Sequence, residues 1–202
     1  DALLRHKKEL QDELFEKYLY QPDSPIRNDA NYLSILEQLI KSRRISDLNK
    51  TRFIYQQQLI RQNLVGLIAN NFDFTTIDNQ RGELMSIDAE YLILFFNNPE
   101  CSGCKDIISF LNGSDLINEA IDTEKLKILS IYSDNNKDLW KKTVYPYKWL
   151  NAMDLSQTIY KENLYDLRAI PSLYLLNAEN RVLIKEGTIE EIIYFLENST
   201  KF

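Results

Sequence analysis

The spacing of apolar residues changes near residue 71, and the change divides the chain into two parts. Before it, apolar side chains recur every three or four positions, which is the period of an amphipathic helix. Three helices are predicted from three groups of residues, namely Leu3, Leu10, Leu14 and Tyr18, then Tyr32, Leu36, Leu39 and Ile40, then Ile60, Leu64, Leu67 and Ile68. Residues 1–71 are therefore expected to form a helical N-terminal domain.

Breaks between these helices can also be read from the sequence. Pro22 and Pro25 separate the first helix from the second, because proline lacks the amide proton that a helix interior needs. Asn28 and Asp29 supply side-chain acceptors that suit the start of the second helix. A weaker break is expected over residues 43–49.

After residue 71 the pattern is typical of strands that alternate with helices. Residues 72–86 predict a β-hairpin around the polar turn 78–82, and 91–96 is an uninterrupted apolar run, as in strands covered on both faces. Residues 126–132 predict a second buried strand. Helical segments are expected at 106–112, 137–142 and 155–161, a hairpin at 173–176 and 181–184, and a capped helix at 188–197. Residues 72–202 are thus predicted to form an α/β sandwich.

Composition and charge exclude several classes of function. Thirty acidic and twenty-four basic residues give a net charge of -6, and the basic ones are scattered, so nucleic acid is not an expected partner. The apolar run at 91–96 is far shorter than the roughly 20 residues of a membrane-spanning helix. Any membrane attachment is expected only through a lipid anchor upstream of Asp1. The five glycines form no phosphate-binding loop, and no cofactor is expected.

The only two cysteines, Cys101 and Cys104, stand three residues apart between a predicted strand and a predicted helix. A helix N-terminus favours a thiolate, which is the form that attacks a disulfide. Cys104 follows one helical turn later on the same face, where it can resolve a mixed disulfide. The spacing therefore indicates a dithiol/disulfide redox centre.

Two other interpretations of this pair remain open. C-x-x-C is also half of many zinc sites, but a structural zinc ion needs two further ligands, and the chain has one histidine, His6, in the first predicted helix. A purely structural disulfide that closes a four-residue loop contributes only about 2 kcal/mol in the chain-entropy model. We therefore expect no metal site, and we expect stabilisation of the fold to be a minor role of the cysteine pair.

With these motifs in place, residues 72–202 resemble the thioredoxin superfamily, and within it the TlpA/ResA-like group of extracytoplasmic bacterial thiol-disulfide proteins. The matching features are the strand followed by Cys101-Ser-Gly-Cys104-Lys105, the segment 164–172 with Ile170-Pro171, and the hairpin after it. The helical part resembles that of thioredoxin-like lipoproteins from Bacteroidetes. The resemblance implies a thioredoxin-like α/β/α sandwich, residues 72–202, preceded by a small all-α domain of about three helices, residues 1–71.

The resemblance also implies roles for particular residues. Cys101 would be the nucleophile and Cys104 the resolving thiol, while a cis Ile170–Pro171 bond would lie beside the sulfurs and present the backbone of Ile170 to an extended substrate. An ordinary trans bond at this position remains the alternative, since only about 5–6% of X-Pro bonds are cis. The implied function is a thiol-disulfide oxidoreductase, acting as reductant or isomerase on client proteins and regenerated by an upstream redox partner, in an extracytoplasmic location.

Two alternative functions are retained beside this one. The first is a thioredoxin-fold binding module whose helical domain docks a partner and whose dithiol is incidental. The second is peroxide reduction, which ranks last because the sequence before Cys101 lacks the motif found in peroxiredoxins.

The sequence also departs from the family pattern around the cysteines. Glu100 stands where thioredoxins usually have tryptophan, and its negative charge opposes thiolate formation. The positions of the family's usual proton acceptors are occupied by Phe95 and Ile107. Glu100 and Asp106 are therefore the candidates for tuning the acidity of the dithiol. The Ser-Gly pair between the cysteines also lacks the histidine found in strongly oxidising relatives, which favours a reducing role over a strongly oxidising one.

Overall fold

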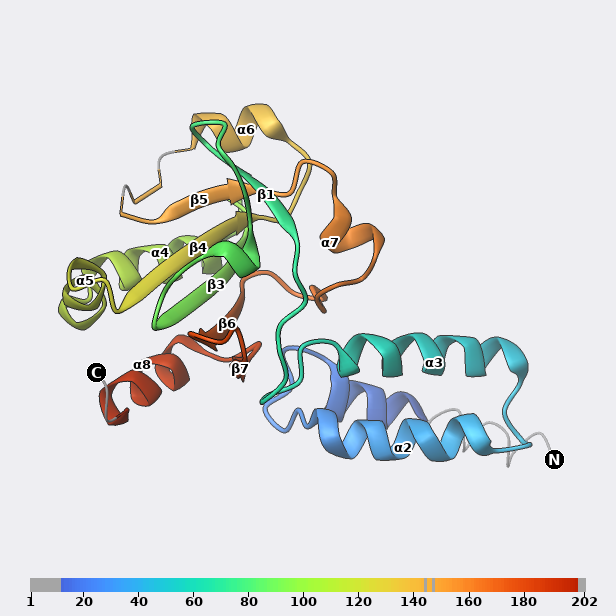
Figure 1. Cartoon of the computed structure of the whole chain (residues 1–202). Helices are drawn as coiled ribbons and strands as arrows, with labels where there is room; N and C mark the ends of the chain where they lie inside the picture. Colours follow the sequence, from blue (N-terminus) through green and yellow to red (C-terminus); the bar gives the residue numbers. More distant parts are fainter. Residues whose placement is uncertain (1–11, 144, 147, 200–202) are drawn as a thin grey trace. The chain divides into compact units, whose positions relative to one another are not determined.

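The computed structural model describes residues 12–143, 145–146 and 148–199, and the chain divides into two compact units, residues 1–61 and 62–202 (Figure 1). The sequence pattern had suggested a boundary near residue 71. Residues 62–71 belong to the second unit because they pair with its last hairpin. The amide of Gly66 donates to Val182 O at 2.8 Å, the amide of Val182 donates to Leu67 O at 2.9 Å, and Ile68 forms an isolated bridge with Arg181.

The first unit is helical within its described residues. Residues 12–20 end in a π-helical turn, η1 (Glu16–Tyr20), and are followed by α2 (Asp29–Lys41) and α3 (Asp47–Arg61). Asn28 caps α2 by accepting from the amide of Asn31 at 2.9 Å. The core of this unit consists of Tyr20, Tyr32, Leu36, Leu39, Phe53 and Ile60. Leu3, His6 and Leu10, which the sequence placed in the first helix, lie outside the described residues.

The prediction for the third helix was wrong at its C-terminal end. Ile60 lies on α3, but Leu64, Leu67 and Ile68 follow the helix end at Arg61. Asn63 adopts a positive φ of 51°, and Gly66 one of 87°, so the backbone leaves the helical region here. The apolar residues beyond Arg61 had the spacing of a helix but lie in a connection made of turns.

The second unit is built on a seven-stranded sheet with the order β2-β1-β5-β4-β3-β6-β7. Its strands are β1 (Asp73–Thr76), β2 (Arg81–Glu83), β3 (Tyr91–Asn97), β4 (Leu126–Tyr132), β5 (Leu150–Met153), β6 (Ser172–Asn177) and β7 (Val182–Lys185). β3, β4 and β5 are parallel, whereas β1 and β6 run antiparallel to their neighbours in this central group.

Both faces of the central strands are buried, as their continuous apolar sequence predicted. In β3, Ile93 and Phe95 enter one core together with Cys104, while Leu94 and Phe96 enter the other. The first core is covered by α4 (Ser102–Gly113), α5 (Asp115–Asp122) and α8 (Ile189–Asn198). The second is covered by residues of the β1 hairpin, α7 (Thr158–Lys161) and the segment that follows it. The expected α/β sandwich is confirmed.

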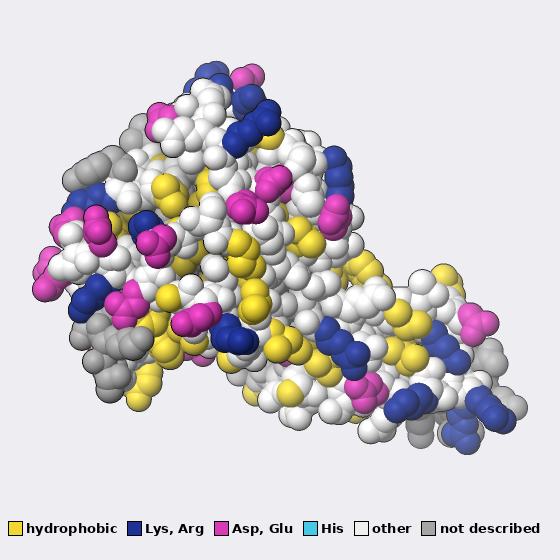
Figure 2. Space-filling model, viewed as in Figure 1, with side chains coloured by type: hydrophobic (Ala, Val, Ile, Leu, Met, Phe, Trp, Pro, Cys, Tyr) yellow, Lys and Arg dark blue, Asp and Glu magenta, His cyan; other side chains and the backbone are white. Residues whose placement is uncertain are grey.

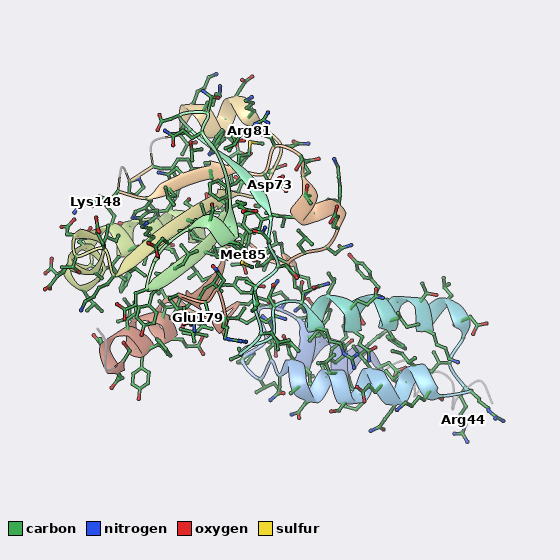
Figure 3. The ribbon with its side chains drawn as sticks, viewed as in Figure 1. Arg44, Asp73, Arg81, Met85, Lys148 and Glu179 are labelled. Carbon is green, nitrogen blue, oxygen red and sulfur yellow. The ribbon has the colours of Figure 1, made fainter. Side chains whose placement is uncertain are left out.

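Two elements were missing from the sequence prediction. β5 is only four residues long and includes the polar Asn151, so its pattern in the region 135–161 did not stand out. No proline separates α5 from α4. Instead, Ser114 ends α4 and caps α5 by accepting from the amide of Ile117 at 3.4 Å. Lys148, in the loop before β5 (Figure 3), lies 2.6 Å from Asp122 at the end of α5.

The predicted hairpin at 72–86 was wrong in its second half: β2 begins at Arg81, inside the predicted turn, and Leu84–Ser86 form a short 3-10 helix, η2, in which Leu84 is buried in the second core. Two later elements follow their predicted positions closely. α6 (Lys137–Lys142) has the predicted bounds, and α8 begins with a complete capping box formed by Thr188 and Glu191. Acidic and basic side chains are interspersed on the face in view in Figure 2, with no large patch of one sign. Among the described residues, no helix has both the length and the apolar character needed to cross a bilayer.

Candidate functional site

The first cysteine lies where a strand gives way to a helix. β3 ends at Asn97, and a tight turn follows in which Asn98 accepts from the amides of Glu100, at 2.9 Å, and Cys101, at 3.0 Å. Cys101 is the N-cap of α4, and its sulfur accepts from the amide of Cys104 at 3.3 Å. Cys101 is partly exposed, and its Sγ lies at the positive end of the α4 dipole.

The second cysteine is buried beneath the first. Cys104 has no exposed surface and packs in an apolar core with Phe95 and Leu111. Burial, followed by the hydrogen bond and charge of Cys101, raises the pKa of the Cys104 thiol from 9.0 to about 12. The site thus contains one sulfur open to reagents and one that stays protonated inside the protein.

The opposite wall of the site is formed by Ile170 and Pro171. Their peptide bond is cis, and the carbonyl oxygen of Ile170 lies 3.5 Å from the Cys101 sulfur. A Cβ built on Gly103 would lie 3.4 Å from Pro171 Cδ, so the start of α4 packs directly against the proline. Residues about 70 positions apart in the sequence therefore meet at the sulfur.

A groove of about 650 Å³ opens beside Cys101. Apolar side chains form much of its surface, among them Phe96, Ile131, Leu167 and Ile170. The exposed Tyr160, on α7, and the carboxylates of Glu100 and Asp134 also line it. An extended peptide that carried a disulfide could therefore contact apolar and polar groups next to the reactive sulfur.

The two carboxylates considered as tuning groups occupy different positions. Glu100 is exposed and lines the groove, whereas Asp106 is exposed on α4 and does not line it. Neither side chain contributes to the raised pKa of Cys104. The charge of Glu100 acts instead on Tyr132, whose pKa is raised by burial first, then by Asp134 and then by Glu100.

Sequence analysis missed a buried polar cluster beneath the dithiol. The side-chain amide of Asn97 donates to Ser130 Oγ at 2.8 Å, and the hydroxyl of Tyr145 donates to Asn97 Oδ1 at 3.4 Å. Burial raises the pKa of Tyr145, with Tyr132 and Cys104 as further causes. Asn97 was detectable as a polar residue that ends an apolar strand, but nothing in the sequence links it to Tyr145.

A second missed cluster supports the segment that leads to Ile170. The side chain of Asp166 is fully buried and forms an ion pair with Arg168 at 2.8 Å. Arg168 also lies 3.8 Å from Glu186. The Tyr174 hydroxyl donates to Glu186 at 3.2 Å. These bonds join residues 166–168 to β6 and the end of β7, and so fix the wall opposite Cys101.

A mixed sheet with helices on both faces, together with a C-x-x-C pair at a helix start beside a cis X-Pro bond, defines a redox-type thioredoxin fold. The chain belongs to the thioredoxin superfamily, and comparisons with known structures agree. A crystal structure of a thioredoxin-like protein from Bacteroides caccae is 39% identical, with a TM-score of 0.89; the match covers 92% of this chain and 68% of that one.

Other matches cover the second unit or the first. The C-terminal domain of an uncharacterized protein from Bacteroides fragilis is 41% identical with a TM-score of 0.66, over 67% of this chain and 99% of that one. A domain of a "possible thiol-disulfide isomerase" from Cytophaga hutchinsonii is 23% identical with a TM-score of 0.59, over 70% and 96%, and shares the fold. Residues 5–63 match the family described as "Domain of unknown function (DUF5106)". None of the curated proteins compared with the chain matches it.

Proposed function

We propose that this protein is a thiol-disulfide oxidoreductase that exchanges electrons between the Cys101–Cys104 dithiol and disulfides of client proteins. The observation that carries the proposal is the partly exposed Cys101 sulfur at the start of α4, which opens onto a groove. Cys104 lies within one helical turn, as a resolving thiol must.

The reaction is a pair of exchange steps. The Cys101 thiolate attacks one sulfur of the client disulfide, a mixed disulfide forms, and the first client thiolate leaves and takes up a proton. Cys104 then loses its proton and attacks Cys101, which releases the second client thiolate. The client disulfide gains two electrons and two protons, and the enzyme dithiol loses them.

The high pKa of Cys104 favours a reductant or isomerase over a strong oxidant. Only a small fraction of Cys104 is ionised near neutral pH, so the burial that raises its pKa slows the second step. A mixed disulfide that persists gives another client thiol time to attack, which is isomerisation. For net reduction, a dithiol protein acting upstream must return two electrons to the Cys101–Cys104 disulfide.

The proposed setting is extracytoplasmic, because client disulfides persist in oxidising compartments. The proposal needs no metal or organic cofactor, since sulfur chemistry alone balances both steps.

The test is reduction of insulin and refolding of a scrambled disulfide protein, with dithiothreitol as electron donor. Wild type should accelerate at least one reaction, Cys101→Ser should fall to the uncatalysed rate, and Cys104→Ser should accumulate a mixed disulfide with the client. The reduction potential of the pair should be measured in parallel. Turnover that survives Cys101→Ser would refute the proposal and leave a binding module of thioredoxin fold.

A further inference from the structure

The groove beside Cys101 is lined by carboxylates without an accompanying cation. Glu100 and Asp134 both line it and are exposed. A third carboxylate, Asp154, is only 6% exposed and accepts from the amides of Ser156 and Ile159, so it is used within the fold. None of the described residues that line the groove is lysine, arginine or histidine. Two solvent-facing negative charges beside apolar walls produce a local negative potential.

Tyr132 provides a second and independent sign of a ligand. It lines the same groove and is only 2% exposed, and within the part of the chain that the structure describes its hydroxyl donates to no acceptor. Buried hydroxyls normally donate to an acceptor, so one whose proton has none needs an explanation. Tyrosine hydroxyls keep their proton near neutral pH, and burial raises the pKa of Tyr132 further, so the hydroxyl can act as a donor. The backbone carbonyls of an extended peptide are suitable acceptors.

We propose that the groove selects client segments that carry lysine or arginine beside the reactive cysteine. The cation lies near Glu100 and Asp134, and a backbone carbonyl of the client accepts from Tyr132. The inference rests on the proposed function and names its substrate class. Small anionic disulfides such as oxidised glutathione are poor substrates, since their carboxylates meet the same two charges and their backbone is too short to extend along the apolar wall.

A single-turnover measurement with the reduced full chain tests this inference. The substrates are three peptides of one sequence, with cysteine joined to the same chromogenic thiol and with lysine, glutamine or glutamate next to it. The lysine peptide should release the thiol roughly fivefold faster than the glutamate peptide at low salt, with glutamine between them. Near 1 M salt the difference should shrink to less than about twofold, because the Debye length falls to about 3 Å.

Matched variants distinguish the effect of the groove carboxylates from the effect of the protein's net charge. Glu100→Gln with Asp134→Asn should bring the three peptides to within about twofold of one another. Glu119→Gln with Glu197→Gln changes the net charge equally at exposed sites on α5 and α8, and should keep the wild-type order. Tyr132→Phe should slow all three peptides by a similar factor while leaving alkylation of Cys101 by a small neutral reagent unchanged.

The outcomes distinguish the inference from the function on which it rests. Exchange that proceeds at one rate with all three peptides, or an order of rates that survives the groove double variant, would overturn the charge selectivity and leave the oxidoreductase intact. If no peptide reacts faster with wild type than with Cys101→Ser, the oxidoreductase proposal fails, and the substrate class fails with it.

Discussion

At the residue scale, Cys101 and Cys104 are three positions apart but have different surroundings. Cys101 caps a helix at the protein surface, whereas Cys104 lies on the inner side of the first turn against Phe95. At the position where the resemblance would place a buried acid, this chain has the apolar ring of Phe95. Burial is the largest cause of the raised pKa of Cys104. The protein thus combines a presented sulfur with a second thiol that stays protonated at neutral pH.

This raised pKa predicts how the stability of the reduced protein depends on pH. In the unfolded chain Cys104 ionises near 9.0, while in the folded protein it keeps its proton to about 12. Its contribution to stability is therefore complete below pH 9 and is lost as pH rises towards 12. Between about pH 8 and pH 10, the free energy of unfolding should fall by roughly 1.4 kcal/mol more in wild type than in Cys104→Ala.

Urea unfolding of the reduced proteins across this range measures the difference directly. The comparison cancels the contributions of tyrosines with raised pKa values, since Tyr165 and Tyr174 are present in both proteins. Parallel alkaline profiles for wild type and variant would contradict the raised pKa.

At the element scale, the turn between β5 and α7 forms part of the groove wall and depends on one carboxylate. Asp154 accepts from Ser156 Oγ at 2.7 Å and from the amide of Ile159 at 2.8 Å. The short helix that follows has only four residues, Thr158–Lys161, so its position relies on these bonds more than on its own propensity.

Asp154→Ala should therefore destabilise the protein by about 1–2 kcal/mol and also slow client exchange. Thr188→Ala is the matched control: it removes the cap of α8, costs about 1 kcal/mol, and acts on an element that does not line the groove. Urea unfolding and thiol release should be measured on both variants. Equal exchange rates in the two variants would show that the turn does not shape the groove.

At the scale of the whole molecule, residues 62–71 extend the second unit beyond the predicted strands. Asn63 and Asn70 both donate through their side-chain amides to the carbonyl of Leu164, at 2.7 and 2.8 Å, and the amide of Ala69 donates to Asn180 O at 2.9 Å. Leu164 begins the segment that carries Ile170. The connection therefore stabilises the groove wall as well as the last hairpin.

A chain that starts at residue 62 should consequently be more stable than one that starts at residue 72, by roughly 3 kcal/mol, because several backbone and side-chain hydrogen bonds are lost. Urea unfolding followed by tryptophan fluorescence measures this, since both tryptophans, Trp140 and Trp149, lie in the second unit. Equal stability of the two truncated chains would show that residues 62–71 act only as a linker.

Local pattern was enough to predict much of this architecture. β4 and α6 were predicted with their observed bounds, and the capped final helix within one residue of its N-terminal end, because periodicity and capping residues are properties of a few neighbouring positions. The position of the cysteines between a strand and a helix was also predicted from the sequence. Local pattern failed at the end of α3, where helical spacing continued into residues that form turns.

The sequence by itself determined the order of strands and helices and the two cysteines at the start of α4. Only the tertiary structure decided what surrounds them: the carbonyl of Ile170 at the Cys101 sulfur, the apolar burial of Cys104, the buried Tyr132 hydroxyl and the carboxylates around the groove. The physical reason is that helices and strands follow from hydrogen bonds and spacing between near neighbours. Burial, pKa and groove shape arise instead from residues that are tens of positions apart and meet only when the sheet assembles.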